Sequence, residues 1–241
     1  MDIQNAWSTM NIASVRRFLS DGMYQRVNTQ FSMMRILNQQ NMIENVELKE
    51  AVINRSESDG RHDIIHVAVY AVIKEQFISS AYPNLNSAIH EEFIEYWSFI
   101  RKTTAVGKDM YHDANCPNCG GDIRSNLGEL SRCPYCGTIT NAGDYNWVLA
   151  KITTADDYRL RSRQGFMQSL DEKIEALLED DPEFSVLKLE DKASNAFLQL
   201  ETACILKNPK QIKRFINDAY AKRFADQITR ESDFVYNRML H

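Results

Sequence analysis

Two short cysteine motifs contain the residues of this sequence whose type and spacing are best suited to chemistry. Cys116-Pro-Asn-Cys119-Gly and Cys133-Pro-Tyr-Cys136-Gly repeat one pattern, with thirteen residues between Cys119 and Cys133. Two residues between cysteines let one tight turn direct both sulfurs at a single metal ion, and the glycine that follows allows the positive φ that such a turn requires. Two such turns complete a shell of four thiolates. The spacing therefore predicts a closed structural zinc site with Cys116, Cys119, Cys133 and Cys136 as ligands.

Other uses of paired cysteines fit this pattern less well. Disulfides within the motifs would be strained, and matched pairs of cysteines are more typical of a reducing compartment than of a secreted disulfide scaffold. A redox CxxC motif normally occurs once, at the start of a helix. Rubredoxin-like iron uses a similar shell, so iron stays the alternative metal. The fifth cysteine, Cys204, lies outside the pattern and is expected to be a buried apolar residue.

The rest of the sequence offers no comparable catalytic pattern. Nucleotide-binding, metalloprotease and hydrolase motifs are absent, and the five histidines are scattered. Of these, His112 could support the metal ligands from outside the shell, although simple adjacency explains it equally well. Two charged groups are interpreted as solvated surface: Glu91, Glu92 and Glu95 at a strand edge, and Arg159, Arg161 and Arg163 at a helix start. We therefore predict that the protein is not an enzyme.

Composition and charge narrow the class of protein further. Hydrophobic residues make up 44% and charged residues 25%, as in ordinary globular proteins. The net charge of -5 argues against a broad nucleic-acid-binding surface, so no nucleic-acid partner is expected. No apolar run approaches the roughly 20 residues that span a bilayer, and the first residues do not resemble a secretory signal. We expect a soluble cytoplasmic fragment, with a membrane anchor left open for the full-length protein.

Hydrophobic periodicity predicts helices, then strands, then helices again. Helical spacing covers 1–44, with a break at Ser20-Asp21-Gly22 that suits the start of a second helix. Runs rich in β-branched and aromatic residues at 46–53 and 64–77 predict a hairpin, and 79–90 reads as a loop. Two further strands are expected at 92–102 and 145–152. Helical patterns then cover 156–179, 184–206 and the rest of the chain.

The cysteine motifs fall between the last two predicted strands, at about 112–138. This places them in an elaborated hairpin loop. A loop of about 27 residues is too small to be ordered by its own apolar core, so we expect the metal to supply the order.

The last part of the chain repeats the first. Residues 5–31 align without a gap on 202–228 at a constant offset, and seven positions are identical. The identical pairs include Asn11 with Asn208, Phe18 with Phe215 and Asp21 with Asp218. Two amphipathic helices can resemble one another by chance, but a gapless alignment with matched breaks favours a duplication. The second copy has no strands after it, so we expect either that the chain is a piece of a longer protein or that these helices dock on the first lobe or on a second chain.

Several of these segments resemble a known family. The strand Phe93–Lys102 (FIEYWSFIRK), the motifs CPNCG and CPYCG, and Gly143–Ile152 (GDYNWVLAKI) resemble bacterial members of the inner-membrane translocase subunit 44-like family. This family belongs to the nuclear transport factor 2-like superfamily, whose domains are α+β cones. The resemblance implies a curved antiparallel sheet packed with helices. It also implies a tethering role, because the mitochondrial relative is a peripheral membrane tether that links an import channel to a chaperone motor.

Together these observations predict an α+β fold with two parts. Residues 1–155 form a cone-shaped lobe with a zinc ribbon inserted at about 112–138, and residues 156–241 are helical, with 184–241 repeating the opening helices as an incomplete second lobe. The predicted function is a non-enzymatic protein-interaction or tethering domain near a membrane, whose partner is another protein or a membrane-proximal assembly. A homodimer through 198–241 is also expected to be possible. The alternative is a ligand-binding or catalytic cone with a pocket lined by His66, Tyr70, Tyr96 and Trp97.

Overall fold

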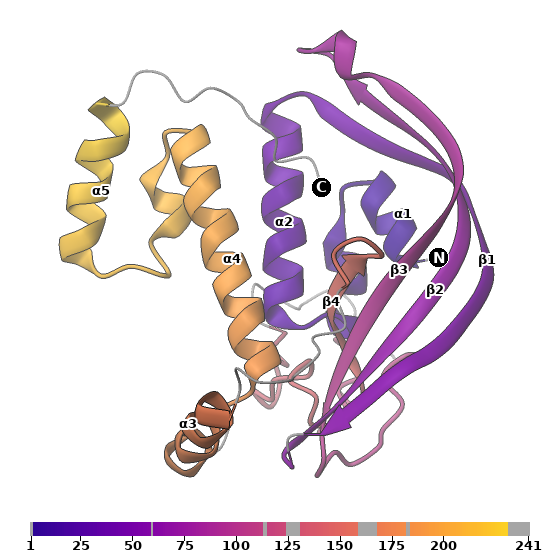
Figure 1. Ribbon diagram of the computed structural model, residues 1–241, viewed down its shortest axis with the longest axis vertical. Helices are drawn as coiled ribbons and strands as arrows, with labels where there is room; N and C mark the ends of the chain where they lie inside the picture. The colour runs from indigo at the N-terminus through magenta and orange to yellow at the C-terminus, as the bar shows by residue number, and fades with distance from the viewer. Residues whose placement is uncertain are drawn as a thin grey trace.

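Strands and helices segregate along the chain, which confirms the predicted α+β class. A computed structural model describes residues 2–58, 60–112, 115–123, 131–158, 168–181 and 184–230 (Figure 1). The opening helical elements are α1 (Asp2–Ser8), η1 (Ile12–Phe18) and α2 (Asp21–Ile36). The strands are β1 (Gln39–Ser58), β2 (His62–Ser79), β3 (Ser87–Lys102) and β4 (Val148–Thr154), with the short helix η2 (Pro83–Leu85) between β2 and β3. The later helical elements are α3 (Gln168–Asp180), α4 (Val186–Ile205), η3 (Pro209–Ile212) and α5 (Asp218–Arg230).

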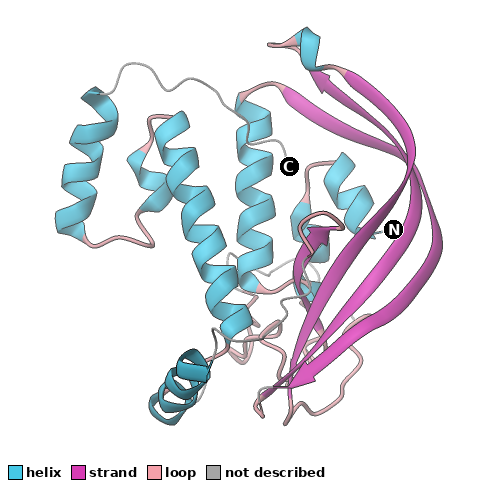
Figure 2. Ribbon diagram, in the orientation of Figure 1, coloured by secondary structure: helices cyan, strands magenta, loops and turns pink. Residues whose placement is uncertain are grey.

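The four strands form one antiparallel sheet in the order β1-β2-β3-β4. Figure 2 shows the three long strands curving past α1, so that the first helices lie on the concave side. Side chains alternate between the two faces of the sheet. Trp97 and Phe99 of β3 share a face with Phe77 of β2, and these residues pack against the helical core. That core is built from the apolar faces of α1, η1 and α2, and its fully buried members include Val15, Leu19 and Phe31.

Three predicted boundaries within this lobe are wrong. The helix predicted to 44 ends at Ile36, because Asn38 adopts a left-handed φ of 52° and Gln39 already pairs with Ser79. The predicted loop 79–90 ends earlier, since Ser87 pairs with Phe77. In both cases, pairing with the neighbouring strand makes a segment a strand although its local sequence predicts a helix or a loop. The fourth strand begins at Val148 rather than at 145, because the preceding residues turn back to the end of β3, where Lys102 N donates to Gly143 O at 2.9 Å.

The predicted start of α2 is confirmed. Ser20 Oγ accepts a hydrogen bond from Met23 N at 3.1 Å, as an N-cap should. Ser20 N also donates to Leu149 O of β4 at 2.8 Å, and Leu19 forms a parallel bridge with Leu149. The start of the helix is therefore fixed to the edge of the sheet.

Helix α4 lies alongside α2, on the side away from the long strands (Figure 1). An ion pair joins Arg26 of α2 to Asp191 of α4, and Thr202 Oγ1 donates to Met33 Sδ at 3.1 Å. The helix predicted from 184 to 206 is thus present, although it begins at Val186. The helix predicted at 156–179 is wrong at its start, because 155–157 form a turn; 159–167 lie outside the described residues, and α3 runs from Gln168. Among the described residues, no helix is both long and apolar enough to cross a membrane.

The segment from the end of α4 to α5 adopts the backbone conformation of the opening helices. Met10 has a φ of 49°, and Lys207, which is 197 positions later, has a φ of 48°. The next residues, Asn11 and Asn208, donate their N–H groups to Ala6 O and Ala203 O at 2.8 and 2.9 Å. The cap of α2 also has a counterpart, since Asn217 Oδ1 accepts from Tyr220 N at 2.8 Å.

Candidate metal centre

The cysteine motifs belong to a long connection between two paired strands. Strands β3 and β4 are antiparallel partners, from Glu95 with Thr154 to Ile100 with Val148. Residues 103–147 connect them, so the motifs do interrupt a strand-to-strand hairpin. We call residues 115–123 and 131–138 the cysteine module. The chain on each side of the module is held to the lobe separately, because Arg17 Nη2 donates to Tyr111 O at 3.2 Å and Asn141 Nδ2 donates to Leu19 O at 2.6 Å.

Each motif folds as the same tight turn. Gly120 N donates to Cys116 O at 2.8 Å, and Gly137 N donates to Cys133 O at 2.9 Å. Both glycines have a positive φ, 75° and 73°, which a residue with a side chain adopts only under strain. The turns are closed by Cys116 N to Gly121 O at 2.7 Å and Cys133 N to Thr138 O at 2.8 Å. No helix starts at either turn, unlike the arrangement of a redox CxxC.

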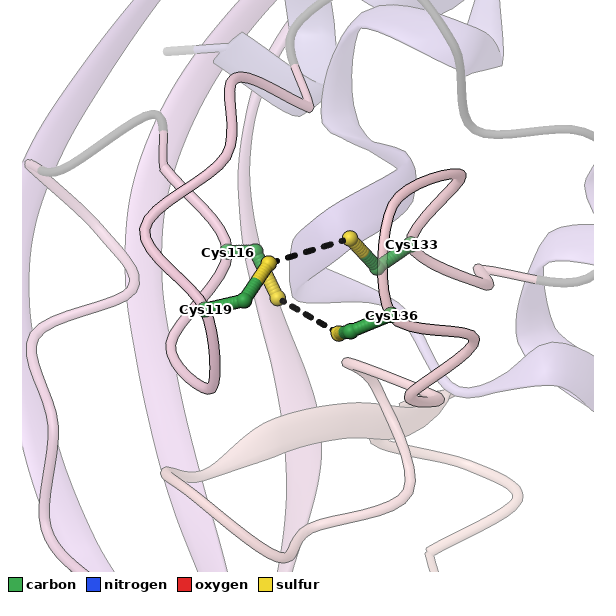
Figure 3. Close-up of side chains that lie close together, drawn as sticks. All are labelled: Cys116, Cys119, Cys133 and Cys136. Carbon is green, nitrogen blue, oxygen red and sulfur yellow. Dashed lines mark hydrogen bonds between the residues drawn. The ribbon is translucent and has the colours of Figure 1, made fainter.

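The two turns face each other and bring the four thiols together (Figure 3). All four Sγ atoms lie within 4.8 Å of one another, and Cys116 Sγ to Cys136 Sγ and Cys119 Sγ to Cys133 Sγ are both 3.7 Å. A tetrahedral zinc with Zn–S bonds of about 2.3 Å places its sulfurs about 3.8 Å apart. A disulfide needs about 2.0 Å, and all four cysteines are free. The thiol positions therefore fit a metal ion at their centre and do not fit two disulfides.

Burial and hydrogen bonding differ among the four thiols. Cys116 and Cys133 are buried and pack with Ile123, whereas Cys119 and Cys136 are exposed. Hydrogen bonds from the side chains of Thr138 and then Asn118 lower the pKa of Cys136 to about 5. Burial raises the pKa of Cys116.

The pKa of Cys119 shifts in the opposite direction from that of Cys136. The N–H of Gly121 lowers the pKa of Cys119, but burial and hydrogen bonds with the other three thiols outweigh it and raise this pKa to about 12. The hydrogen bonds from Thr138 and Asn118 thus favour the thiolate form of Cys136. A cation bound among the sulfurs would stabilise the remaining thiolates.

The positions of His112 and Cys204 can be compared with their predicted roles. His112 lies outside the thiol cluster, and its Nδ1 is 2.9 Å from Asp109 Oδ2 on the surface. It is therefore paired with a neighbouring carboxylate rather than with a cysteine ligand. Cys204 is half-buried and packs beside the apolar cluster of Ala203 and Ile212, so it has an apolar environment but is not fully buried.

The residues predicted to line an alternative pocket do not come together. His66, Tyr70 and Tyr96 lie on the face of the sheet that points away from the opening helices, whereas Trp97 lies on the opposite face, in the helical core. Trp97 Nε1 donates to Glu95 Oε2 at 2.9 Å, and burial raises the pKa of Glu95. The prediction of a solvated edge thus holds for the exposed Glu91 and Glu92 but is wrong for Glu95, because its carboxylate lies against Trp97, which packs on the helical core.

A polar cluster around His66 was missed by sequence reasoning. His66 Nδ1 lies 2.8 Å from Ser98 Oγ, and its Nε2 lies 3.2 Å from Glu57 Oε1. A serine, a histidine and a glutamate in a row resemble a nucleophilic triad. Ser98, however, is only 2% exposed, so its hydroxyl cannot reach a substrate and the row is a cross-strand link. The register of three strands creates this cluster, and the local sequence gives no signal for it. Arg159, Arg161 and Arg163 lie outside the described residues.

The described residues line a hollow against α4 and another against the cysteine module. One of 110 Å³ lies between β4 and α4 and includes the Arg26–Asp191 ion pair in its wall. The other, an open hollow of 520 Å³, lies beside the cysteine module and is lined by Lys102, Thr104, Val106, Thr138, Ile139, Ala142, Asp144 and Tyr145.

Comparison with known proteins leaves the chain unassigned. No family model and no curated protein matches it. A solved structure, that of the intermembrane space region of the chloroplast protein ARC6, is similar over 41% of this chain and 75% of its own, with 9% identity and a TM-score of 0.30. A likeness this slight supports no statement about fold or function. What is established at the site is a cluster of four cysteines able to hold a metal ion.

Proposed function

We propose that this chain is a non-enzymatic protein-interaction or tethering domain whose cysteine module is ordered by one structural zinc ion. The observation that carries the proposal is the closed set of four thiols. Four sulfurs at tetrahedral spacing occupy every position of a zinc ion and leave none for a substrate. Zinc bound by Cys116, Cys119, Cys133 and Cys136 would thus hold two turns together without taking part in a reaction.

The surface around the module supports an interaction role. Tyr135 belongs to the second turn and is 66% exposed, although its ring covers Gly121 of the first turn. Val106, 67% exposed, and Ile139 line the neighbouring hollow of 520 Å³. An exposed tyrosine is typical of the residues that contribute most to binding in protein interfaces. Because the turns are rigid only when the metal is bound, the metal would determine whether this surface exists.

The cytoplasmic and membrane-proximal setting is also part of the proposal. It rests on the resemblance of Phe93–Lys102 and Gly143–Ile152 to the translocase subunit 44-like family. In this reading the chain is the protein-binding part of a tether, and its partner is a protein at or near the membrane.

Metal content tests the structural zinc directly. The purified chain should contain one zinc per molecule by elemental analysis, and Cys119→Ser should lower that ratio while Cys204→Ser should not. If elemental analysis instead finds one equivalent of iron, the bound metal is iron, the alternative that the cysteine spacing also allows. Less than half an equivalent of any metal in the unaltered chain would contradict the proposed site.

Site-specific photocrosslinking in the native cell tests the interaction surface. A benzophenone amino acid at position 135 should give a discrete crosslinked protein, and the same group at Tyr82, an exposed tyrosine in the turn between β2 and β3, should not. Adding Cys119→Ser should abolish the product by disordering the turn. Equal products at both positions, or a product that survives Cys119→Ser, would refute a metal-ordered contact surface.

A further inference from the structure

Exposure divides the cysteines of the module into two kinds. Cys116 and Cys133 are only 3% and 1% exposed, whereas Cys119 and Cys136 lie exposed at the surface. Each turn therefore contributes one buried and one exposed cysteine. An oxidant in solution can reach the exposed cysteine of either turn while the module stays folded.

The short sulfur distances pair each exposed cysteine with a buried one. Cys136 Sγ lies 3.7 Å from Cys116 Sγ, and Cys119 Sγ lies 3.7 Å from Cys133 Sγ (Figure 3). Both pairs join the first turn to the second. An accessible cysteine with a second thiol beside it is the arrangement of a redox-sensor site, because the second thiol can attack the first once that one is oxidised. The module contains this arrangement twice.

Other contacts also join the two turns. Asn118 Nδ2 donates to Thr138 Oγ1 at 3.0 Å and lies 3.5 Å from Cys136 Sγ. The ring of Tyr135 lies so close to Gly121 that a Cβ atom there would be 2.4 Å from its Cδ2. While the turns are folded, these contacts keep the paired sulfurs opposite each other. A disulfide has an S–S distance of about 2.0 Å, so each pair has to close by about 1.7 Å.

We propose that the cysteine module is a redox switch. Hydrogen peroxide oxidises its four thiolates to two disulfides, Cys116–Cys136 and Cys119–Cys133, and zinc is released. The inference rests on the structural zinc proposed above and adds the regulation of that site. Both disulfides link one turn to the other, which distinguishes them from the disulfide within the motif of a redox CxxC.

Each disulfide forms in two steps. The exposed thiolate attacks one oxygen of hydrogen peroxide, the O–O bond breaks and hydroxide leaves, so the sulfur is oxidised to a sulfenic acid and the peroxide is reduced. The buried thiolate of the same pair then attacks that sulfur, which forms the S–S bond, breaks the S–O bond and expels a second hydroxide. Two molecules of peroxide thus convert four thiolates into two disulfides and four hydroxides. Zn²⁺ leaves because no thiolate remains to bind it.

The switch acts on the proposed contact surface. Tyr135 lies between the two cysteines of the second turn, and its ring packs on the first turn. Sulfurs bound to one zinc ion lie about 3.8 Å apart, against about 2.0 Å in a disulfide. Oxidation therefore changes the spacing of the turns at the place where Tyr135 bridges them. Peroxide should weaken binding at this surface, and a reductant with zinc should restore it.

The test treats the zinc-loaded full chain with excess hydrogen peroxide and follows metal and thiols together. A chromogenic zinc chelator should report the release of one equivalent of zinc. Free thiols should fall from five to one, because Cys204 lies outside the cluster. A reductant with added zinc should restore both values. Cys204→Ser is the matched control, which should release the same amount of zinc and leave no free thiol.

Trypsin digestion without reduction identifies the disulfides. Cleavage after lysine and arginine places the cysteines of the first motif in peptide 109–124 and those of the second motif in peptide 133–151. Disulfides between the turns join these two peptides, whereas disulfides within the motifs leave them separate. Fragmentation between the two cysteines of each peptide then assigns which sulfur is bonded to which.

Peptides that stay separate, sulfinic acids in place of disulfides, or zinc retained in excess peroxide would each overturn the switch. A chain without zinc before peroxide is added contradicts the structural zinc instead. The tryptic peptides still decide the redox switch in that case, since they join or stay separate with or without metal. Failure of the switch and failure of the zinc site are therefore separate outcomes.

Discussion

Loss of the metal should disorder the cysteine module and leave the rest of the lobe folded. The perturbation is Cys133→Ser combined with Cys136→Ser, which removes two of the four sulfurs and with them the tetrahedral shell. We expect backbone amides in 115–123 and 131–138 to lose protection from hydrogen exchange. Amides of the central strand β2, around the buried Ala68 and Ala71, should keep their protection.

The size of the effect follows from the contents of the module. Its described part has about 17 residues, and fixing their backbones costs about 1 kcal/mol each, or about 17 kcal/mol. Its apolar core contains one large side chain, Ile123, whose burial contributes about 2–3 kcal/mol. A tetrathiolate zinc contributes about 10–16 kcal/mol. A bound zinc ion would therefore supply most of the free energy that orders the module.

The rest of the lobe loses little because few contacts join it to the module. Lys108 Nζ donates to Pro117 O, a hydrogen bond that contributes about 1 kcal/mol to stability. The flanking residues keep their own attachments, such as Asn141 to Leu19 O. We therefore expect the free energy of unfolding of the lobe to fall by about 1–2 kcal/mol.

Hydrogen exchange followed by mass spectrometry locates the change, and urea unfolding measures the loss for the lobe. Cys204→Ser is the control, because it removes a thiol outside the cluster and should leave exchange in the module unchanged. If the double variant instead loses protection in β2 together with the module, in a single cooperative transition, the module is part of the core and the reasoning is wrong.

Three further predictions concern the junction between α2 and α4. Ser20→Ala should lower the free energy of unfolding by about 1 kcal/mol, because Met23 N loses its cap; urea denaturation would show this, and an unchanged midpoint would contradict it. Gly22→Ala should lower the free energy of unfolding by about 1–3 kcal/mol, because a methyl group there would overlap Asp191. A melting temperature equal to that of the wild type would exclude that contact. Burial raises the pKa of Asp191, although Arg26 opposes the shift. The folded chain therefore holds this proton more tightly than the unfolded chain does. The stability that results is lost as pH rises from about 4 through the raised pKa. Asp191→Asn should remove that decline, and urea midpoints that differ from wild type by a constant amount between pH 4 and 6 would refute it.

The candidate metal ligands were predictable because their geometry is local. Two residues between cysteines and a glycine after them define each turn, whatever surrounds it. The thirteen intervening residues then leave enough chain for the turns to meet. The α+β class and the hairpin of β1 and β2 were predictable for a similar reason, since periodicity and a polar turn are properties of neighbouring residues.

Boundaries and faces were not predictable to the same degree. Gln39–Glu44 had the pattern of a helix, but pairing with Ile78 and its neighbours made it strand. Adjacent residues on a strand face opposite sides, so Tyr96 and Trp97 could not have shared one pocket. Which of the two faces the helices cover was decided by packing, as was the position of Glu95.

The sequence by itself determined which four cysteines cluster, the order of helices and strands, and the likeness between the opening and closing helices. Only the tertiary structure decided that α4 docks on α2 through Arg26 and Asp191 and that Leu48 and Ile53 of β1 are exposed. The physical reason is the range of the interactions. A turn or a cap depends on residues a few positions apart. Docking and coverage depend instead on contacts between apolar surfaces that lie far apart in the chain.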